Sequence, residues 1–347
     1  MLEFDIKSGY FKDMKCIIKY IGKSINLFKS EPQINSEIVN NLFSIIKNVL
    51  TTVKEKIISL YNLFINDKDG IYDDNDRSDQ NSDIMQLQKI YKYINILYSG
   101  FHNLSEYSFV KLAKENLLEF YTKFWDEELD YLLKNKENKN IKNSIREVHE
   151  NSIALCINFY NIFLEYSDNE TFRKYSLEYF PKTQKIEESE KILSEVASGY
   201  GIIFERQDNS IFKEKFSNSF TFIQKILERN ITDENAITYD RAIRSFGKYI
   251  YYKCYNDEIG YNLALKFVKL IPPIHDLAES EKVCVEFLDQ INEERNNILL
   301  QEEIKEETKN AVNRIIQLNQ QENFIDDFTK ILKACMTLEL NFSHLVD

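Results

Sequence analysis

The chain has 347 residues, a hydrophobic content of 43% and a formal net charge of −12. This apolar content excludes a disordered tail, and the length allows a large buried core. The 8 glycines and 4 prolines are too few for the turns of a sheet-rich fold of this size. The negative charge argues against nucleic acid as the main partner, because phosphate contacts require clustered Lys and Arg. It favours a basic protein partner, or it serves only solubility.

The N-terminus and the cysteines indicate the compartment. Glu3 and Asp5 lie near the N-terminus and no long apolar run follows, so we expect neither a signal peptide nor a membrane-spanning helix. The cysteines are far apart and lack the spacing of a zinc site: Cys16, Cys156, Cys254, Cys284 and Cys335. They predict a reducing compartment in which cysteine is a small apolar core residue.

Apolar residues recur at alternating intervals of three and four along most of the chain, which predicts helices and no strand. In 141–166, for example, Val148, Leu155 and Phe159 belong to one continuous stripe. The same pattern recurs in 235–254 and in 277–296. Short polar segments separate the predicted helices. The two prolines at 272–273 must end one helix, because proline lacks the amide donor.

The predicted helices form pairs at regular spacing. The second helix of each pair is expected to begin near one of these positions: Asn35, Asp83, Ile141, Ser189, Asn235, Leu277 and Phe324. The period of roughly 40 to 58 residues is close to the ~40–47 of HEAT and armadillo repeats. Neither helix of such a pair can bury its apolar face alone, so the pairs stack. The expected fold class is all-α, a single right-handed HEAT-repeat solenoid of about seven helix pairs over 1–347.

One segment interrupts this pattern. Residues 67–83 are poor in apolar side chains and rich in aspartate, including Asp73, Asp74, Asp76 and Asp79. They predict a mobile acidic loop within the second repeat, which is either only solvated or in contact with a basic partner. A magnesium site for diphosphate would need a second Asp-rich motif, and a calcium loop would need a glutamate closing a twelve-residue frame. The sequence offers neither.

Two stretches, 238–250 (TYDRAIRSFGKYI) and 269–291, resemble the C-terminal repeats of the karyopherin-β (importin-β) family, in particular its importin-five branch. The resemblance is carried by residues of both stretches: Ala242, Gly247 and Lys248, then Ile271, Pro272, Asp276, Glu279 and Glu281. Ala197 and Gly201 match the preceding repeat, and the acidic segment 67–83 sits where that branch has an acidic insertion. Pro273 and Ile274 depart from the family pattern, and residues 301–347 show little identity.

The resemblance implies a nuclear transport receptor that shuttles between cytoplasm and nucleus, of which this chain would be the C-terminal third. Such a receptor binds protein cargo on its concave face and phenylalanine–glycine nucleoporins on its convex face. It binds Ran-GTP mainly through an N-terminal region that we expect this chain to lack. No enzymatic activity and no cofactor are implied.

Three carboxylates are the candidate cargo-binding residues, because second helices line the concave face in this architecture. Asp240, Asp289 and Glu293 could each hold a lysine or arginine of a basic cargo through charge-assisted hydrogen bonds. One alternative is an ordinary solvated face, with Asp240 paired to Arg241 or Arg244. Another is a structural role in which Asp240 caps the next repeat.

No motif predicts catalysis or a metal site. The histidines lie outside metal-binding frames, and no nucleophile motif accompanies them: His102, His149, His275 and His344. Trp125 is expected in the core or between repeats; a pocket for a nucleoporin phenylalanine is the alternative. For the whole chain, a HEAT-repeat scaffold unrelated to transport is the second hypothesis, and a helical enzyme with a deep polar cavity is the third.

Overall fold

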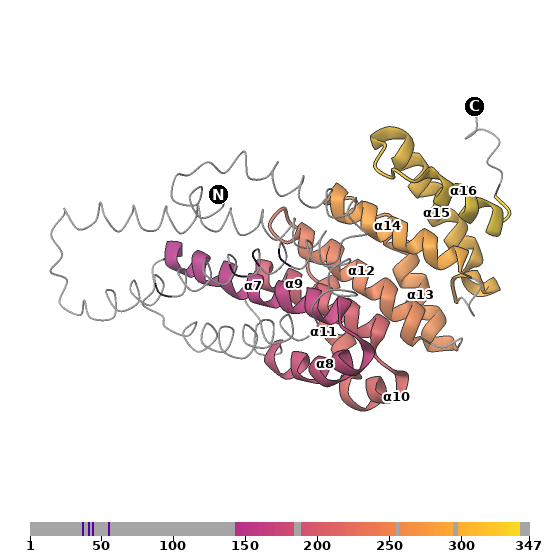
Figure 1. Ribbon diagram of the computed structural model, residues 1–347. Coiled ribbons are helices and arrows are strands. Elements are labelled where there is room, and N and C mark those ends of the chain that lie inside the picture. The colour runs from indigo at the N-terminus through magenta and orange to yellow at the C-terminus, as the bar shows by residue number, and fades with distance from the viewer. Residues whose placement is uncertain are drawn as a thin grey trace. The chain divides into compact units, whose positions relative to one another are not determined.

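The computed structural model describes residues 143–183, 189–254, 257–293 and 298–340, together with four isolated helical positions, Glu37, Asn41, Ser44 and Glu55. The chain divides into two units, Met1–Phe172 and Arg173–Asp347, and each is described by itself. The described ranges are all-helical and contain no strand, as the periodicity predicts (Figure 1). In chain order the elements are α7 (Asn143–Tyr166), α8 (Asn169–Thr183), α9 (Glu190–Arg206), α10 (Asn209–Ile211), the π-helical turn η2 (Phe212–Phe216), α11 (Ser219–Leu227), α12 (Ala236–Lys253), α13 (Glu258–Lys269), α14 (Leu277–Asn292), the 3-10 turn η3 (Ile298–Leu300), α15 (Glu302–Glu322) and α16 (Phe328–Thr337).

In the first unit, α7 covers the helix expected over 141–166, and the side chains that it buries follow a helical stripe. They recur at intervals of three and four: Ile153, Cys156, Ile157, Tyr160, Phe163 and Leu164. This stripe is offset from the predicted one, of which only Ile162 has a described side chain, also buried. The helix was therefore predicted correctly, but a second apolar face was missed because α7 is apolar on more than one side.

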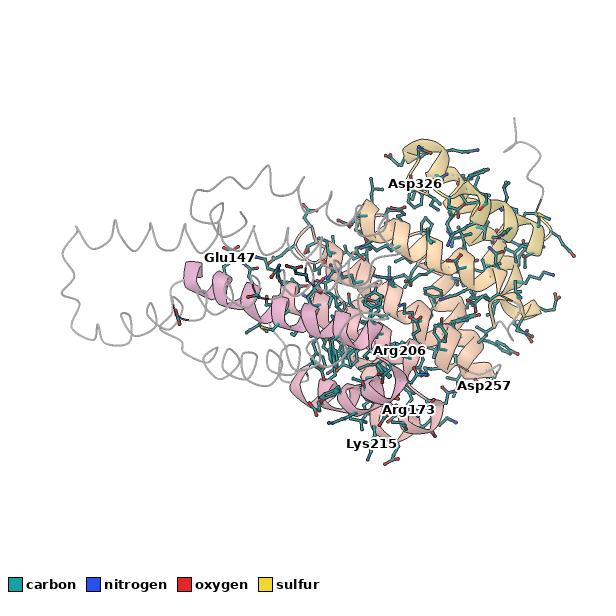
Figure 2. The ribbon with its side chains drawn as sticks, in the orientation of Figure 1. Glu147, Arg173, Arg206, Lys215, Asp257 and Asp326 are labelled. Atoms are coloured by element: carbon teal, nitrogen blue, oxygen red, sulfur yellow. The ribbon has the colours of Figure 1, made fainter. Side chains whose placement is uncertain are left out.

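In the second unit, helices that follow one another in sequence pack as pairs. Aromatic contacts join α8 to α9 through Tyr179 and Tyr200, whose ring centroids are 5.7 Å apart. Phe220 of α11 stacks on Tyr249 of α12 with centroids 3.9 Å apart. Phe267 of α13 meets the ring of Phe287 on α14, and α15 packs against α16. Side chains fill the space between these helices (Figure 2).

The pairs also contact one another side by side. Helix α12 lies between α9 and α14, α14 lies between α12 and α16, and α13 contacts α15. Figure 1 shows these helices following one another in chain order, from α9 through α12 and α14 to α16. Helices α9 and α12 run in the same direction, because Thr238 near the start of α12 bonds to Glu190 at the start of α9, and Lys253 at its end bonds to Gln207 just after α9.

Small residues set the close approach of α9 to α12. The Ser245 hydroxyl donates a 2.6 Å hydrogen bond to the backbone carbonyl of Ala197. A methyl group at Gly201 would lie 2.6 Å from Ser245 Oγ, so this position accepts no side chain without movement. Gly247 of α12 allows a similarly close approach to α13, because a methyl group there would lie 2.7 Å from the Phe267 ring.

Several helix boundaries lie where the sequence places them. Helices α9, α12 and α14 begin beside Ser189, Asn235 and Leu277, and α13 ends three residues before Pro272. The last second helix, expected near Phe324, begins instead at Phe328. Asn323 adopts a left-handed conformation (φ 48°) that ends α15, and Asp327 then caps α16 through the Thr329 amide. The Asp327 cap and the left-handed Asn323 therefore set this boundary, and the first apolar residue, Phe324, does not.

Candidate interaction surface

A row of charged side chains crosses the adjacent helices α9, α12 and α14. Helix α12 supplies cations spaced by three and four residues, which places them along one face: Arg241, Arg244 and Lys248. The two neighbouring helices supply the carboxylates. Glu195 and Glu205 come from α9, and Glu279 and Glu286 come from α14. The basic helix therefore lies between two acidic ones.

Each of these three cations contacts at least one of these carboxylates. Arg241 Nη1 lies 2.5 Å from Glu195 Oε1, and its Nε lies 3.4 Å from Glu279 Oε1. Arg244 Nε donates a 2.8 Å hydrogen bond to Glu286. Lys248 Nζ lies 2.7 Å from Glu205 Oε2 and 3.7 Å from Glu286 Oε1. One network thus joins three helices.

Glu279 and Glu286 of α14 are held in the ionised state by this network. Burial opposes the ionisation of Glu279, but Arg241, Lys282 and Arg244 outweigh it, so its pKa lies below the usual value. For Glu286, burial is likewise outweighed by Arg244 and Lys248, and its pKa is also lowered. Because these charges neutralise one another within the fold, little of this row is left to attract a partner.

Asp240, a predicted cargo-binding residue, is completely buried. Its Oδ1 lies 2.8 Å from His275 Nδ1, and its Oδ2 accepts a 2.8 Å hydrogen bond from the backbone amide of Asp276. Asp276 is the N-cap of α14. The Asp240 side chain of α12 therefore fixes the start of α14. Burial raises the pKa of Asp240 despite these bonds. This geometry matches the capping role named above as the alternative, and Asp240 offers no exposed surface to a cargo.

Asp289 and Glu293, the other two predicted cargo-binding residues, lie at the opposite end of α14. Asp289 is 46% exposed, and its two oxygens accept hydrogen bonds of 2.6 and 2.7 Å from Lys330 Nζ of α16. Glu293 is exposed and accepts a hydrogen bond from the Tyr251 hydroxyl. They are separated from the Asp240 contact by about 20 Å of helix, so the three carboxylates do not form one site. A binding role for Asp289 and Glu293 stays a prediction.

Lys253 and Arg314 bridge consecutive helix pairs. No sequence pattern singles them out. Lys253 Nζ donates to the backbone carbonyl of Gln207 and to Asn209 Oδ1, and it lies over the Phe212 ring. Burial lowers the pKa of Lys253 to about 8, although the Asp208 carboxylate acts in the opposite direction.

Arg314 of α15 plays a similar part at the end of α13. Its guanidinium donates 2.8 Å hydrogen bonds to the backbone carbonyls of Val268, near the end of α13, and of Ile271, just after it. The Glu307 carboxylate orients it at 3.0 Å. Arg173, labelled in Figure 2, adds an ion pair of 2.8 Å to Asp208 in the turn after α9. The sequence carries no local signal for these bridges, because the bonded carbonyls lie on other helix pairs.

Several predicted features lie outside the described residues. These are the acidic segment 67–83 with Asp73, Asp74, Asp76 and Asp79, and the side chains of Trp125, His102, His149 and His344. Over the described ranges, no three His, Cys, Asp or Glu side chains lie where they could hold a metal ion. None of the described helices is both long and apolar enough to span a membrane.

The comparisons with known proteins leave the family open. No protein-family model matches the chain, and no curated protein matches it. The resemblance to the karyopherin-β family therefore rests on the residues quoted above alone.

Proposed function

We propose that this chain is an α-solenoid scaffold that binds a protein partner along the layer formed by α9, α12, α14 and α16. The observation that carries the proposal is a repeated distance in sequence between bonded neighbours in this layer. Thr238 bonds 48 residues back to Glu190, Arg244 bonds 42 residues on to Glu286, and Lys330 bonds 41 residues back to Asp289.

This regularity is what stacked helical repeats produce. In a solenoid, each unit contacts only the units before and after it, so lateral contacts recur at one repeat length. The distances of 41 to 48 residues fall close to the ~40–47 of HEAT and armadillo repeats. Repeats of this kind present extended surfaces that serve protein binding. The right-handed superhelix of about seven pairs is part of this proposal.

The proposed partner is a basic protein. The chain carries 56 acidic residues against 44 Lys and Arg, and the row of charges on α9, α12 and α14 is neutralised internally. The surplus negative charge of the sequence therefore lies outside this row, and it can attract Lys and Arg side chains. We propose no catalytic role and no cofactor for this chain.

Within this class, we propose a nuclear transport receptor that shuttles between cytoplasm and nucleus. The support is the resemblance to the karyopherin-β family, in which Ala197, Gly201 and Gly247 are motif positions. The close packing at Gly201 and Gly247 gives these positions a role in joining repeats, which supports the repeat class. Cargo would bind the concave face, phenylalanine–glycine nucleoporins the convex face, and Ran-GTP mainly a region N-terminal to this chain.

Two binding measurements separate the general scaffold proposal from the narrower proposal of a nuclear transport receptor. A panel of Lys/Arg-rich proteins should bind the purified chain with an affinity that falls as salt is raised, because the attraction is electrostatic. A chain that binds none of them contradicts the scaffold proposal. Immobilised phenylalanine–glycine repeats should retain the chain if it is a transport receptor. A chain that binds basic proteins but passes through this column is a scaffold outside nuclear transport.

A further inference from the structure

Exposed apolar side chains gather where α12 and α14 begin. Ile237 in the first turn of α12 is 45% exposed, Ile274 before α14 is 68% exposed, and Leu277 at the first position of α14 is 48% exposed. Ile231, in the turn before α12, is 42% exposed. We call these four residues the isoleucine–leucine patch. Single exposed apolar residues are ordinary, but several at neighbouring helix starts need an explanation.

The contacts of Asp240 bring the two helix starts together. Asp240 bonds to His275 and to the Asp276 amide, and the Tyr239 ring meets the His275 ring edge-on at 5.6 Å. Ile237 lies one turn before Asp240 on the same face of α12, so it is directed toward the 274–277 segment. Asn235 holds the turn containing Ile231 through bonds to Thr232 N and Asn230 O, at this same end of α12.

The patch is presented in a fixed geometry. The buried Ser280 hydroxyl donates to the carbonyl of Pro273 and so anchors the residue beside Ile274. Asp276 accepts a 2.9 Å hydrogen bond from the Glu279 amide, which fixes the first turn of α14 around Leu277. A surface held in this way loses little conformational entropy when a partner binds, which favours recognition.

The rim of the patch is negatively charged. Among the residues that are not buried, 228–241 hold three carboxylates against two arginines, and 274–282 hold two carboxylates against one lysine. All three basic residues are already ion-paired: Arg229 with Glu190, Arg241 with Glu195 and Glu279, and Lys282 with Glu279.

Carboxylates on the rim remain available to a partner. Asp233 and Glu234 are exposed and Glu281 is half-buried, and none of them forms an ion pair with another described residue. The rim therefore carries an excess of negative charge around an apolar centre, which is complementary to an apolar stripe flanked by Lys and Arg.

We infer that the isoleucine–leucine patch binds an amphipathic basic helix of a partner protein. The partner's apolar stripe covers Ile237, Ile274 and Leu277, and its Lys and Arg side chains pair with Asp233, Glu234 and Glu281. This inference rests on the proposed protein-binding function and names the surface that carries it. It places the contact at the opposite end of α14 from Asp289 and Glu293.

The test uses the full chain and a fluorescein-labelled 18-residue model peptide of Leu and Lys with helical apolar spacing. Fluorescence anisotropy should show binding that a scrambled peptide of the same composition does not reproduce. Replacing Ile237, Ile274 and Leu277 together by Ser should weaken binding by at least about tenfold, because the apolar centre is lost. Asp233→Asn with Glu234→Gln should weaken it by about threefold and flatten its salt dependence.

Matched controls make the outcome specific. Ile259→Ser changes an isoleucine that is 73% exposed on α13, outside the patch, and should leave binding unchanged. Glu302→Gln with Glu303→Gln, which neutralises two exposed carboxylates at the start of α15, should also leave it unchanged. If the triple variant lost its helical circular dichroism, Ile274→Ser alone, at the most exposed patch position, should still weaken binding.

Three results would overturn the inference. They are equal binding of the scrambled peptide, wild-type affinity in the patch variants, and a dimer by light scattering that the triple variant abolishes, which would assign the patch to a second copy of the chain. Binding of basic proteins that survives the patch substitutions would leave the scaffold proposal standing without this surface. Loss of all binding to basic proteins would remove both.

Discussion

Asp240 shows how one buried charge can join two helix pairs. Its carboxylate satisfies the backbone amide of Asp276 and a nitrogen of His275, and it has no contact with solvent. Lys253 and Arg314 do the same for backbone carbonyls of other helices. Buried polar groups on a helix end are costly when left unpaired, so these side chains decide which helix ends can lie together.

Asp240→Ala should lower the free energy of unfolding by about 2 to 4 kcal/mol, since it leaves a buried amide and an imidazole without their acceptor. Asp240→Asn should cost less, because its amide oxygen can still accept the Asp276 hydrogen bond. Urea denaturation measures both. Asp289→Ala, which removes a half-exposed carboxylate, is the control and should cost less than about 1 kcal/mol. Equal losses for Asp240→Ala and Asp289→Ala would contradict the capping role.

The buried Lys253 ammonium should make the free energy of unfolding depend on pH. Its pKa falls from the ordinary 10.5 to about 8 on folding, so between these values the unfolded state binds more protons than the folded one. Stability should therefore rise with pH across this window. Relative to Lys253→Met, the wild type should gain about 2 kcal/mol between pH 7 and pH 9.5. Urea denaturation of both proteins at each pH tests this, and a difference that does not change with pH would contradict it.

Of the single residues that join the helix pairs, the sequence predicted only some. It singled out Asp240, whose capping role was one of the alternatives, because an acidic residue on a helix face is visible in sequence. It could not predict that the partner would be the Asp276 amide 36 residues away. Lys253 and Arg314 were missed for the same reason. Their acceptors are backbone carbonyls, which every residue has, so no side-chain pattern marks them.

Helices were the most predictable elements. The apolar spacing of three and four places α9, α12 and α14 almost to the residue, because tertiary contacts and local periodicity agree there. The prediction was four residues early at α16, where the left-handed Asn323 and the Asp327 cap set the boundary. On α7 the predicted stripe left out a second buried face, because periodicity cannot rank two apolar stripes on one helix.

The contact between α9 and α12 predicts the effect of one methyl group. In an unconstrained helix, Gly→Ala stabilises by about 1 kcal/mol. Gly201→Ala should instead destabilise by about 1 to 3 kcal/mol, because its methyl group would overlap Ser245 Oγ. Thermal and urea unfolding measure the loss.

A double variant separates overlap from any other cause of that loss. Adding Ser245→Ala removes Oγ, and the remaining Ser245 atoms lie at an ordinary 3.4 Å from the added methyl group. Gly201→Ala should then be neutral or stabilising, with a coupling free energy of at least about 1 kcal/mol. Strictly additive effects of the two substitutions would mean that α9 and α12 do not meet at this point.

At the scale of the whole molecule, the decisive feature is the lateral stacking of helix pairs. Helix pairs contact the pairs before and after them through bonds that recur about one repeat apart, and the proposed scaffold function follows from that arrangement. The spacing of helix starts in the sequence predicts a period of roughly 40 to 58 residues, and the lateral bonds, 41 to 48 residues apart, fall within it. It could not predict which faces carry paired charges and which remain available, because that depends on the neighbours each helix acquires when the pairs stack.

A charge exchange between α12 and α14 tests lateral stacking most directly. Arg244 and Glu286 are 42 residues apart in sequence and bonded across the two helices. Arg244→Glu and Glu286→Arg should each lower the free energy of unfolding by about 1 to 2 kcal/mol, through repulsion between like charges that are both largely buried. The double exchange should restore most of the loss, with a coupling free energy of at least about 1 kcal/mol in urea denaturation. Additive losses with no recovery would show that α12 and α14 are not lateral neighbours.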